Sequence, residues 1–149
     1  MEKTIAVNRK ARHEYFLEEF YEAGLVLTGT EIKSIRGGHA QFKDAYVDFT
    51  GGEAFIRDMH IAHYDHGNIF NHEETRDRKL LLHKKEIRDL KKKVTVKGYT
   101  VIPVRLYLKK GLAKMEIALA KGKDLYDKRQ SEKMKDAQRE IEKATKMRY

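Results

Sequence analysis

Apolar and polar residues alternate in several short runs of this chain, and this alternation is typical of half-buried β-strands. One apolar face is expected along residues 100–108, formed by Ile102, Val104, Leu106 and Leu108. Residues 115–119 alternate in the same way, and residues 109–111 between the two runs predict a hairpin turn. Pro103 indicates an edge position or a bulge, because proline cannot donate to a strand ladder.

Residues 45–49 and 53–61 predict another pair of strands joined by a turn at Gly51 and Gly52. Residues 13–27 fit two patterns. A helix would carry its apolar stripe on Phe16, Leu17, Phe20 and Tyr21. A strand would carry its apolar face on Tyr15, Leu17, Tyr21 and Ala23. The aromatic content and Gly24 favour the strand.

Residues 83–96 predict a helix that ends at Gly98, and a short helical turn is expected at residues 31–35, ended by Gly37 and Gly38. The prediction is therefore a mainly β protein with flanking α, having five or six short antiparallel strands and one or two packed helices. Closure into a small barrel would remove exposed strand edges. A sandwich would give a similar pattern.

The composition adds constraints to this fold. The chain has 149 residues, of which 40% are apolar, and this fits one domain of ordinary size. It has no Cys, which excludes disulfides, thiolate zinc sites and cysteine nucleophiles. No run approaches the length of a membrane span, and the polar first twelve residues lack an apolar signal core. The expectation is a soluble, cytoplasmic protein with no membrane partner.

Charge divides the chain into a body, residues 1–120, and a basic tail, residues 121–149. The tail holds 16 charged residues among 29, so it cannot bury enough apolar surface to fold alone. A narrow helical stripe nevertheless runs along it, formed by Met134, Ala137, Ile141 and Ala144. We expect the tail to be disordered when free and helical when bound.

A histidine cluster is the most prominent metal candidate in the sequence. His60, His63 and His66 are three residues apart, with His72 nearby, but the segment reads as a strand running into a loop. That spacing puts strand neighbours on opposite faces, and no HExxH pattern accompanies it. No phosphate-binding loop or nucleophile elbow is present either. The sequence predicts no metal site, no cofactor, no catalytic residue and no enzyme activity.

The net charge of +9 favours a polyanionic partner. Basic groups recur beside residues that can stack on bases: residues 8–13 precede Tyr15 and Phe16, and residues 76–79 lead to a second basic group at residues 83–85. Cations for phosphates and flat rings for bases are what RNA binding needs. RNA binding is the resulting interpretation.

Seven segments then resemble one known family in the correct order along nearly the whole chain. They are residues 8–15 (NRKARHEY), 21–24 (YEAG), 27–36 (LTGTEIKSIR), 78–84 (RKLLLHK), 97–100 (KGYT), 118–123 (ALAKGK) and 126–129 (YDKR). The chain thus resembles the small protein B family, the tmRNA-binding (SsrA-binding) proteins of bacteria.

This resemblance implies an oligonucleotide-binding-like, closed antiparallel β-barrel with packed helices. It implies an adaptor of trans-translation that binds the tRNA-like domain of tmRNA near its elbow and enters the vacant A site of a stalled ribosome. The tail would lie in the empty mRNA channel, near the rRNA of the decoding site. Elongation factor Tu would belong to the delivery complex, and the protein would be a monomer.

The expected site residues follow from motif and chemistry together. Those for tmRNA are Arg9, Lys10, Arg12, Glu31, Lys33, Arg36, Arg76, Arg78, Lys79, His83 and Lys84. Those for the ribosome are Gly122, Lys123, Tyr126, Asp127, Lys128, Arg129, Lys133 and Ile141. The Glu31 carboxylate could accept hydrogen bonds from RNA, orient a neighbouring arginine, or cap a helix.

Three positions depart from the family pattern: His63 and Glu74 stand where proline is common, and Asp124 where a basic residue is common. Two other classes of protein remain as alternatives. One is a general basic ribosomal or RNA-chaperone protein. The other is a metal-dependent RNA-processing enzyme that uses the histidine cluster.

Overall fold

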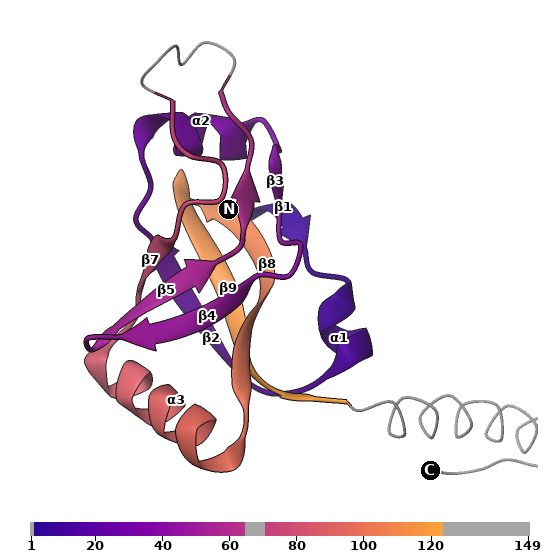
Figure 1. Cartoon of the computed structure of the whole chain (residues 1–149). Coiled ribbons are helices and arrows are strands. Elements are labelled where there is room, and N and C mark those ends of the chain that lie inside the picture. The colour runs from indigo at the N-terminus through magenta and orange to yellow at the C-terminus, as the bar shows by residue number, and fades with distance from the viewer. Residues whose placement is uncertain (1, 65–70, 124–149) are drawn as a thin grey trace, which may run out of the picture.

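The computed structural model describes residues 2–64 and 71–123, and in this part the protein is mainly β with three helices (Figure 1). The strands are β1 (Glu2–Val7), β2 (Tyr15–Leu25), β3 (Ala40–Gln41), β4 (Tyr46–Thr50), β5 (Glu53–Arg57), β6 (His60–Ile61), β7 (Arg78–Leu81), β8 (Thr100–Lys109) and β9 (Leu112–Gly122). The helices are α1 (Lys10–Glu14), α2 (Gly29–Arg36) and α3 (Lys84–Lys97).

Seven of these strands form one antiparallel sheet in the order β1-β8-β4-β5-β7-β2-β9, and β8 also pairs with β9. The pairings from β8 through β4, β5, β7, β2 and β9 therefore return to β8 as a ring of strands, with β1 added at the side of β8. Strands β3 and β6 form a separate two-stranded sheet. The mainly β prediction with flanking helices is confirmed.

Two β-bulges decide which side chains enter the core. One interrupts the pairing of β2 with β9 between Leu17 and Glu19, and the other interrupts the pairing of β8 with β9 between Pro103 and Arg105. Each bulge adds one residue to its strand, so the side chains beyond it change face. The bulge expected at Pro103 is confirmed.

The single apolar face predicted for each of these strands is wrong for the same reason. In β8, Leu106 and Leu108 join the main core, whereas Ile102 lies in a second cluster; Val101, predicted on the opposite face, is buried in the main core. In β2, the strand interpretation is confirmed, but the bulge divides its expected face. Tyr21 and Ala23 pack in the main core and Tyr15 and Leu17 in the second cluster.

The helices lie at different places on this ring. Helix α2 covers one end and α3 lies at the opposite end (Figure 1). Ile87 and Leu90 of α3 are buried in the main core, as is Ile35 of α2. Helix α1 packs on the outside through Ala11, which is buried against Ile102 and Ala120 in the second cluster.

The turns follow the sequence signals. Lys110 and Gly111 both have positive φ and close the β8–β9 hairpin, and Gly51 and Gly52 do the same between β4 and β5. Two-residue hairpins of this kind need positive φ at both positions. Gly98 ends α3 in the left-handed conformation, as expected.

The strand predicted over residues 53–61 is interrupted. Asp58 adopts φ 63, which turns the chain, so that β5 pairs with β4 and β7 whereas β6 pairs with β3. Strands β1, β3 and β7 and helix α1 were not predicted. Strand β9 extends to Gly122, so the boundary expected after residue 120 falls inside a strand. None of the helices in the described ranges is long and apolar enough to cross a membrane.

Candidate nucleic-acid interface

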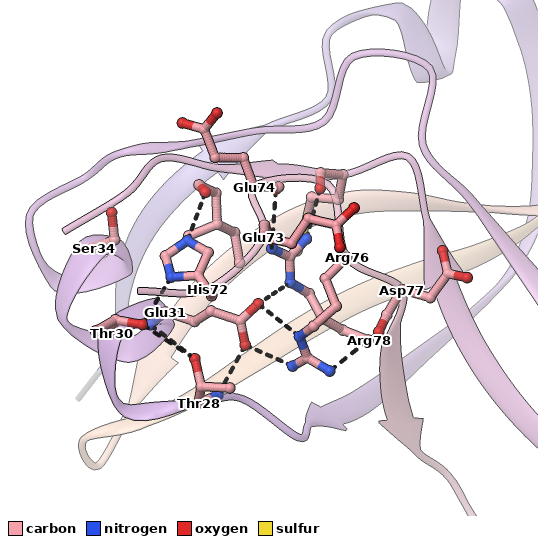
Figure 2. A network of polar contacts seen from close by, with 12 residues as sticks. Thr28, Thr30, Glu31, Ser34, His72, Glu73, Glu74, Arg76, Asp77 and Arg78 are labelled. Atoms are coloured by element: carbon pink, nitrogen blue, oxygen red, sulfur yellow. Dashed lines mark hydrogen bonds and ion pairs between the residues drawn. The ribbon is translucent and has the colours of Figure 1, made fainter. Parts of the chain in front are cut away.

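A buried carboxylate with two arginines lies beneath α2 (Figure 2). Arg78 Nε donates to Glu31 Oε2 at 2.5 Å, and Arg76 Nη2 donates to Glu31 Oε1 at 2.6 Å. The side chains of Glu31 and Arg78 have no exposed surface, whereas that of Arg76 is 36% exposed. We call these three residues the Glu31 cluster.

The local sequence around α2 places the Glu31 carboxylate. Thr28 and Glu31 form a capping box: Thr28 Oγ1 accepts from the Glu31 N–H at 3.3 Å, and Glu31 Oε1 accepts from the Thr28 N–H at 2.8 Å. This arrangement satisfies two backbone donors at the start of the helix. It also points the carboxylate toward Arg76, in the segment before β7, and toward Arg78, the first residue of β7.

Arg78 joins three separate parts of the chain. Besides Glu31, its guanidinium donates to the carbonyl oxygen of Met59 at 2.6 Å and to those of Glu73 and Glu74 at 3.3 and 3.0 Å. The carbonyl of Met59 precedes β6, and those of Glu73 and Glu74 belong to the loop before β7. A single buried side chain therefore holds the loop before β7 against α2 and the segment between β5 and β6.

The residues of the Glu31 cluster stay charged although two of them are buried. Burial alone raises the pKa of Glu31, but hydrogen bonds from Arg76, the Thr28 N–H and Arg78 outweigh it and lower the pKa to about 2. Burial lowers the pKa of Arg78, and its pairing with Glu31 opposes this. Arginine stays protonated in proteins. The cluster thus carries one negative and two positive charges, with the excess positive charge at half-exposed Arg76.

This burial changes the role of two expected RNA contacts. Glu31 and Arg78 offer no surface to a partner in this structure. Of the roles considered for Glu31, the geometry realises two: it caps α2, and it orients Arg76 and Arg78. The RNA contact expected of the Arg78 side chain does not fit its burial, because all its polar contacts are internal.

The histidines of the candidate metal cluster take part in local contacts. His72 is buried, with Nδ1 at 2.9 Å from Thr30 Oγ1 and Nε2 at 2.8 Å from the Ile61 carbonyl. His60 lies 3.5 Å from the Glu74 carboxylate, and His63 meets His72 edge to face. Within residues 2–64 and 71–123, no group of three or more candidate ligands could hold a metal; His66 lies outside these ranges.

Helix α1 and the start of the tail come together on the surface. The Lys123 N–H donates to the Glu14 carbonyl at 2.8 Å, and Lys123 Nζ donates to the Arg12 carbonyl at 3.3 Å. Lys123 Nζ also lies 4.8 Å from the centre of the Phe16 ring, and the Arg12 guanidinium 5.6 Å from that of Phe20. Arg9, Lys10 and Arg12 are exposed beside them.

The basic group predicted at residues 8–13 and the start of the predicted tail at Lys123 are therefore neighbours in space. Both Phe rings are 43% exposed, and they lie on opposite faces of β2 because of the bulge at Leu17. Phe20 was not among the expected site residues. Its exposure on a strand beside Arg12 has no signal in the sequence, because the bulge sets which face it takes.

Lys33 and Arg36 are exposed on α2, the helix that carries Glu31. Lys33 Nζ lies 5.5 Å from the centre of the Tyr64 ring. Arg36 lines a groove of about 340 Å³ between α2 and the β8–β9 turn, together with Leu81 and Leu112, which are 53% and 62% exposed. The groove combines apolar walls with cations at its edge.

The remaining expected residues in the described part follow β7 into α3. Lys79 forms an ion pair with Glu53, and both side chains are nearly half exposed. His83 caps α3, its N–H donating to Glu86 Oε1 at 2.9 Å, and Lys84 is exposed in the first helical turn. The expected residues of the described part thus lie on or next to α1, α2, β7, α3 and the end of β9.

Six expected tail residues lie outside the described ranges: Tyr126, Asp127, Lys128, Arg129, Lys133 and Ile141.

The structure also contains a polar contact that no pattern in the sequence indicates, between Glu22 and Tyr107, which are 85 positions apart. Tyr107 Oη donates to Glu22 Oε2, and Lys109 Nζ lies 3.6 Å from the same carboxylate oxygen. Burial and this bond raise the pKa of Tyr107, and the bond lowers that of Glu22.

The fold and these surfaces define a class: a small, basic, mainly β protein whose exposed cations stand beside aromatic rings and an apolar groove. Comparison with known proteins narrows it. The sequence profile described as "SmpB protein" matches residues 5–147. The chain is 55% identical over 146 residues to an "SsrA-binding protein" of Shouchella clausii, covering 98% of this chain and 94% of that one.

A second relative, the "SsrA-binding protein" of Geobacillus thermodenitrificans, is 56% identical over 142 residues, covering 95% and 92% of the two chains. The chain is also similar to a solved structure described as "tmRNA-SmpB: a journey to the center of the bacterial ribosome". That match has 44% identity and a TM-score of 0.67, and it covers 80% of this chain and 85% of the other. The chain belongs to the SmpB protein family.

Proposed function

We propose that this protein is an RNA-binding adaptor of trans-translation, which binds the tRNA-like domain of tmRNA and brings it to the A site of stalled ribosomes. The observation that carries the proposal is the similarity, over nearly the whole chain, to proteins named for binding SsrA RNA. The exposed cations at α1, α2 and α3 support it, because phosphate contacts need unburied positive charge. The protein acts by binding and catalyses no reaction.

Within this proposal, the ring of strands is an oligonucleotide-binding-like barrel that carries the RNA-binding surfaces. The residues that contact tmRNA are the exposed Arg9, Lys10, Arg12, Lys33, Arg36, His83 and Lys84, with half-exposed Arg76 and Lys79. Glu31 and Arg78 hold α2 and the loop before β7 in position. The protein works as a monomer in the cytoplasm, where elongation factor Tu joins the delivery complex.

The tail, residues 121–149, serves the ribosome in this proposal, with Gly122 and Lys123 at its start. It enters the empty mRNA channel, with Tyr126 stacking on an rRNA base and Lys128, Arg129 and Lys133 on phosphates. The contact of Lys123 with Glu14 and Arg12 supports this assignment, because it starts the tail beside the α1 cations. In this arrangement, the residues that contact tmRNA and the residues that contact rRNA are neighbours on the protein surface.

The RNA that copurifies with the protein from its own cells tests the proposal. Sequencing should find tmRNA enriched over its share of total RNA, together with ribosomal RNA. A truncation after Lys123 keeps every described strand and should retain tmRNA but lose peptide tagging on stalled ribosomes. Enrichment of structured RNAs in proportion to their abundance would instead identify a general RNA-binding protein, and full tagging by the truncation would refute the tail's role.

A further inference from the structure

The outer face of α3, which we define by its exposed cations, carries positive charge that no ion pair of the described residues neutralises. The helix has seven Lys and Arg residues against Glu86 and Asp89. Lys93 alone among its described cations has an ion pair, with Glu19. Five further cations are exposed, and none lies within 4.0 Å of a carboxylate of the described residues: Lys84, Lys85, Arg88, Lys91 and Lys92.

The nearby carboxylates are already engaged or point elsewhere. Glu86 accepts from the His83 N–H. Asp89 lines a cavity on the flank of the helix together with Lys92 and Lys93, but it forms no ion pair with either lysine. Glu53 pairs with Lys79 of the preceding strand. The positive charge of the outer face is therefore not balanced within the described part of the fold.

The packing of α3 fixes this face outward. Ile87 and Leu90 are buried in the core, so the helix cannot rotate without exposing them. Lys84, Arg88 and Lys91 stand at positions i, i+4 and i+7, and this spacing places them on one side of a helix. They span about 10 Å of the helix axis, which is roughly the axial length of three nucleotides of a strand.

Two of these cations stand where folding alone disfavours them. Lys84 and Lys85 are in the first turn of α3, where free backbone N–H groups give the helix end a partial positive charge. Carboxylates are the stabilising residues at that end, and cations are destabilising. A polyanion bound along this face would offset both the helix end and the mutual repulsion of the cations.

We propose that the outer face of α3 binds the sugar–phosphate backbone of the tRNA-like domain of tmRNA. The inference rests on the proposed function and adds Lys85, Arg88, Lys91 and Lys92 to its RNA-binding residues. The tRNA-like domain is the partner because α3 directly follows β7, in the same segment as Lys79, His83 and Lys84. It also begins three residues after exposed Leu81, which lines the groove at Arg36.

The test compares two triple variants of equal charge in the full-length protein. The first is Lys84→Gln with Arg88→Gln and Lys91→Gln, since glutamine keeps the helix propensity. The control is Lys3→Gln with Lys43→Gln and Lys110→Gln, three exposed cations outside α3, one on β1 and two in turns. Affinity for a transcript of the tRNA-like domain is measured against salt concentration, and affinity for purified ribosomes in parallel.

The α3 variant should bind the transcript about tenfold or more weakly at ~0.1 M salt. Its slope of log affinity against log salt should fall by about 2 to 3, because each lost phosphate contact removes about 0.7 to 0.9. Its melting temperature should stay equal or rise, since a cation leaves the first turn of α3. The control should change the affinity only slightly, with a slope near that of the wild type.

Each other result decides between the two proposals. If the wild type binds the transcript and the two variants bind it equally, the α3 inference is wrong and the proposed function stands. If the α3 variant loses ribosome affinity alone, the face belongs to ribosomal RNA, and the inference is again wrong. If the wild type does not bind the transcript at all, the proposed function itself fails.

Discussion

Glu31 pairs with two guanidinium groups at a point where three segments of the chain meet. Its own pairing with Arg78 is fully buried, so the interaction costs desolvation on both sides and its net value is small. Removing one partner is a different matter, because the other charge then remains buried without compensation. The cluster therefore acts less as a source of stability than as a constraint on where α2 and the loop before β7 can lie.

Glu31→Gln should lower the free energy of unfolding by about 3 to 5 kcal/mol, because Arg78 loses its buried counter-charge. Urea denaturation at neutral pH measures this loss. Glu53→Gln is the matched control, since it removes the partner of Lys79 in an ion pair that is nearly half exposed and should change stability little. Equal effects of the two variants would contradict the structural role of Glu31.

The free energy of unfolding at acidic pH should depend on the protonation of the Glu31 carboxylate. The pKa of Glu31 is about 2 in the folded protein against an ordinary value of 4.5, so the folded state binds its proton more weakly than the unfolded state. Its contribution is present above about pH 5 and is lost as the pH falls toward 2. The free energy of unfolding, measured from pH 7 to 2, should fall by about 3 kcal/mol more in the wild type than in Glu31→Gln.

At the scale of single residues, the sequence predicted contacts between near neighbours and missed distant ones. The capping box of Thr28 and Glu31 spans three positions, and helix capping was among the roles considered for Glu31. The pairing of Glu31 with Arg78 joins residues 47 positions apart and depends on how β7 passes α2. Exposure of an arginine cannot be deduced from its charge, which is why Arg78 was expected on the surface.

At the scale of elements, glycine signals predicted turns and helix ends reliably, but the alternation of residues did not predict which strand face is buried. The two hairpins and α3 were predicted because glycines with positive φ mark their turns and ends. Strand β1 is largely exposed and so shows little alternation. The bulges at Leu17 and Pro103 each reversed the face of half a strand, because a single added residue shifts a period of two.

The next prediction concerns the helix that we expect the tail to form when it binds the ribosome. Ile141→Pro removes an amide donor and blocks the preceding turn, at about 3 kcal/mol in a helix interior. If the tail is helical on the ribosome, this variant should tag poorly while its stability in the free state and its tmRNA affinity stay near those of the wild type. Peptide tagging in a reconstituted translation system measures the effect.

The control for this variant is Ile141→Ala, which shortens the side chain but keeps the amide and favours a helix. It should retain more tagging than the proline variant. Normal tagging by Ile141→Pro would show that the tail acts as an extended basic strand. Amides after Lys128 should also exchange fast in the free protein and slowly in the ribosome complex.

For the whole molecule, the distribution of cations over α1, α2 and α3 matters more than any single patch. Helices α2 and α3 lie at opposite ends of the ring (Figure 1), so one partner must be large or folded to reach both. Binding through many separate phosphate contacts releases counterions, and log affinity for the tRNA-like domain should fall linearly with log salt. Affinity that barely changes between ~50 and ~200 mM salt would contradict a backbone-dominated interface.

The pairing of β1 with β8 and of β2 with β9 also determines when the protein can fold. Glu2 faces Lys109 and Tyr15 faces Gly122, so the first strands find their partners only near the end of the sheet. At about 5 to 20 residues per second of synthesis, the early strands wait roughly 5 to 20 s before the ring can be completed. Long-range pairing of this kind is slow to nucleate. A newly made chain therefore passes through a period in which its strand edges are exposed, and chaperone protection during synthesis should raise its yield.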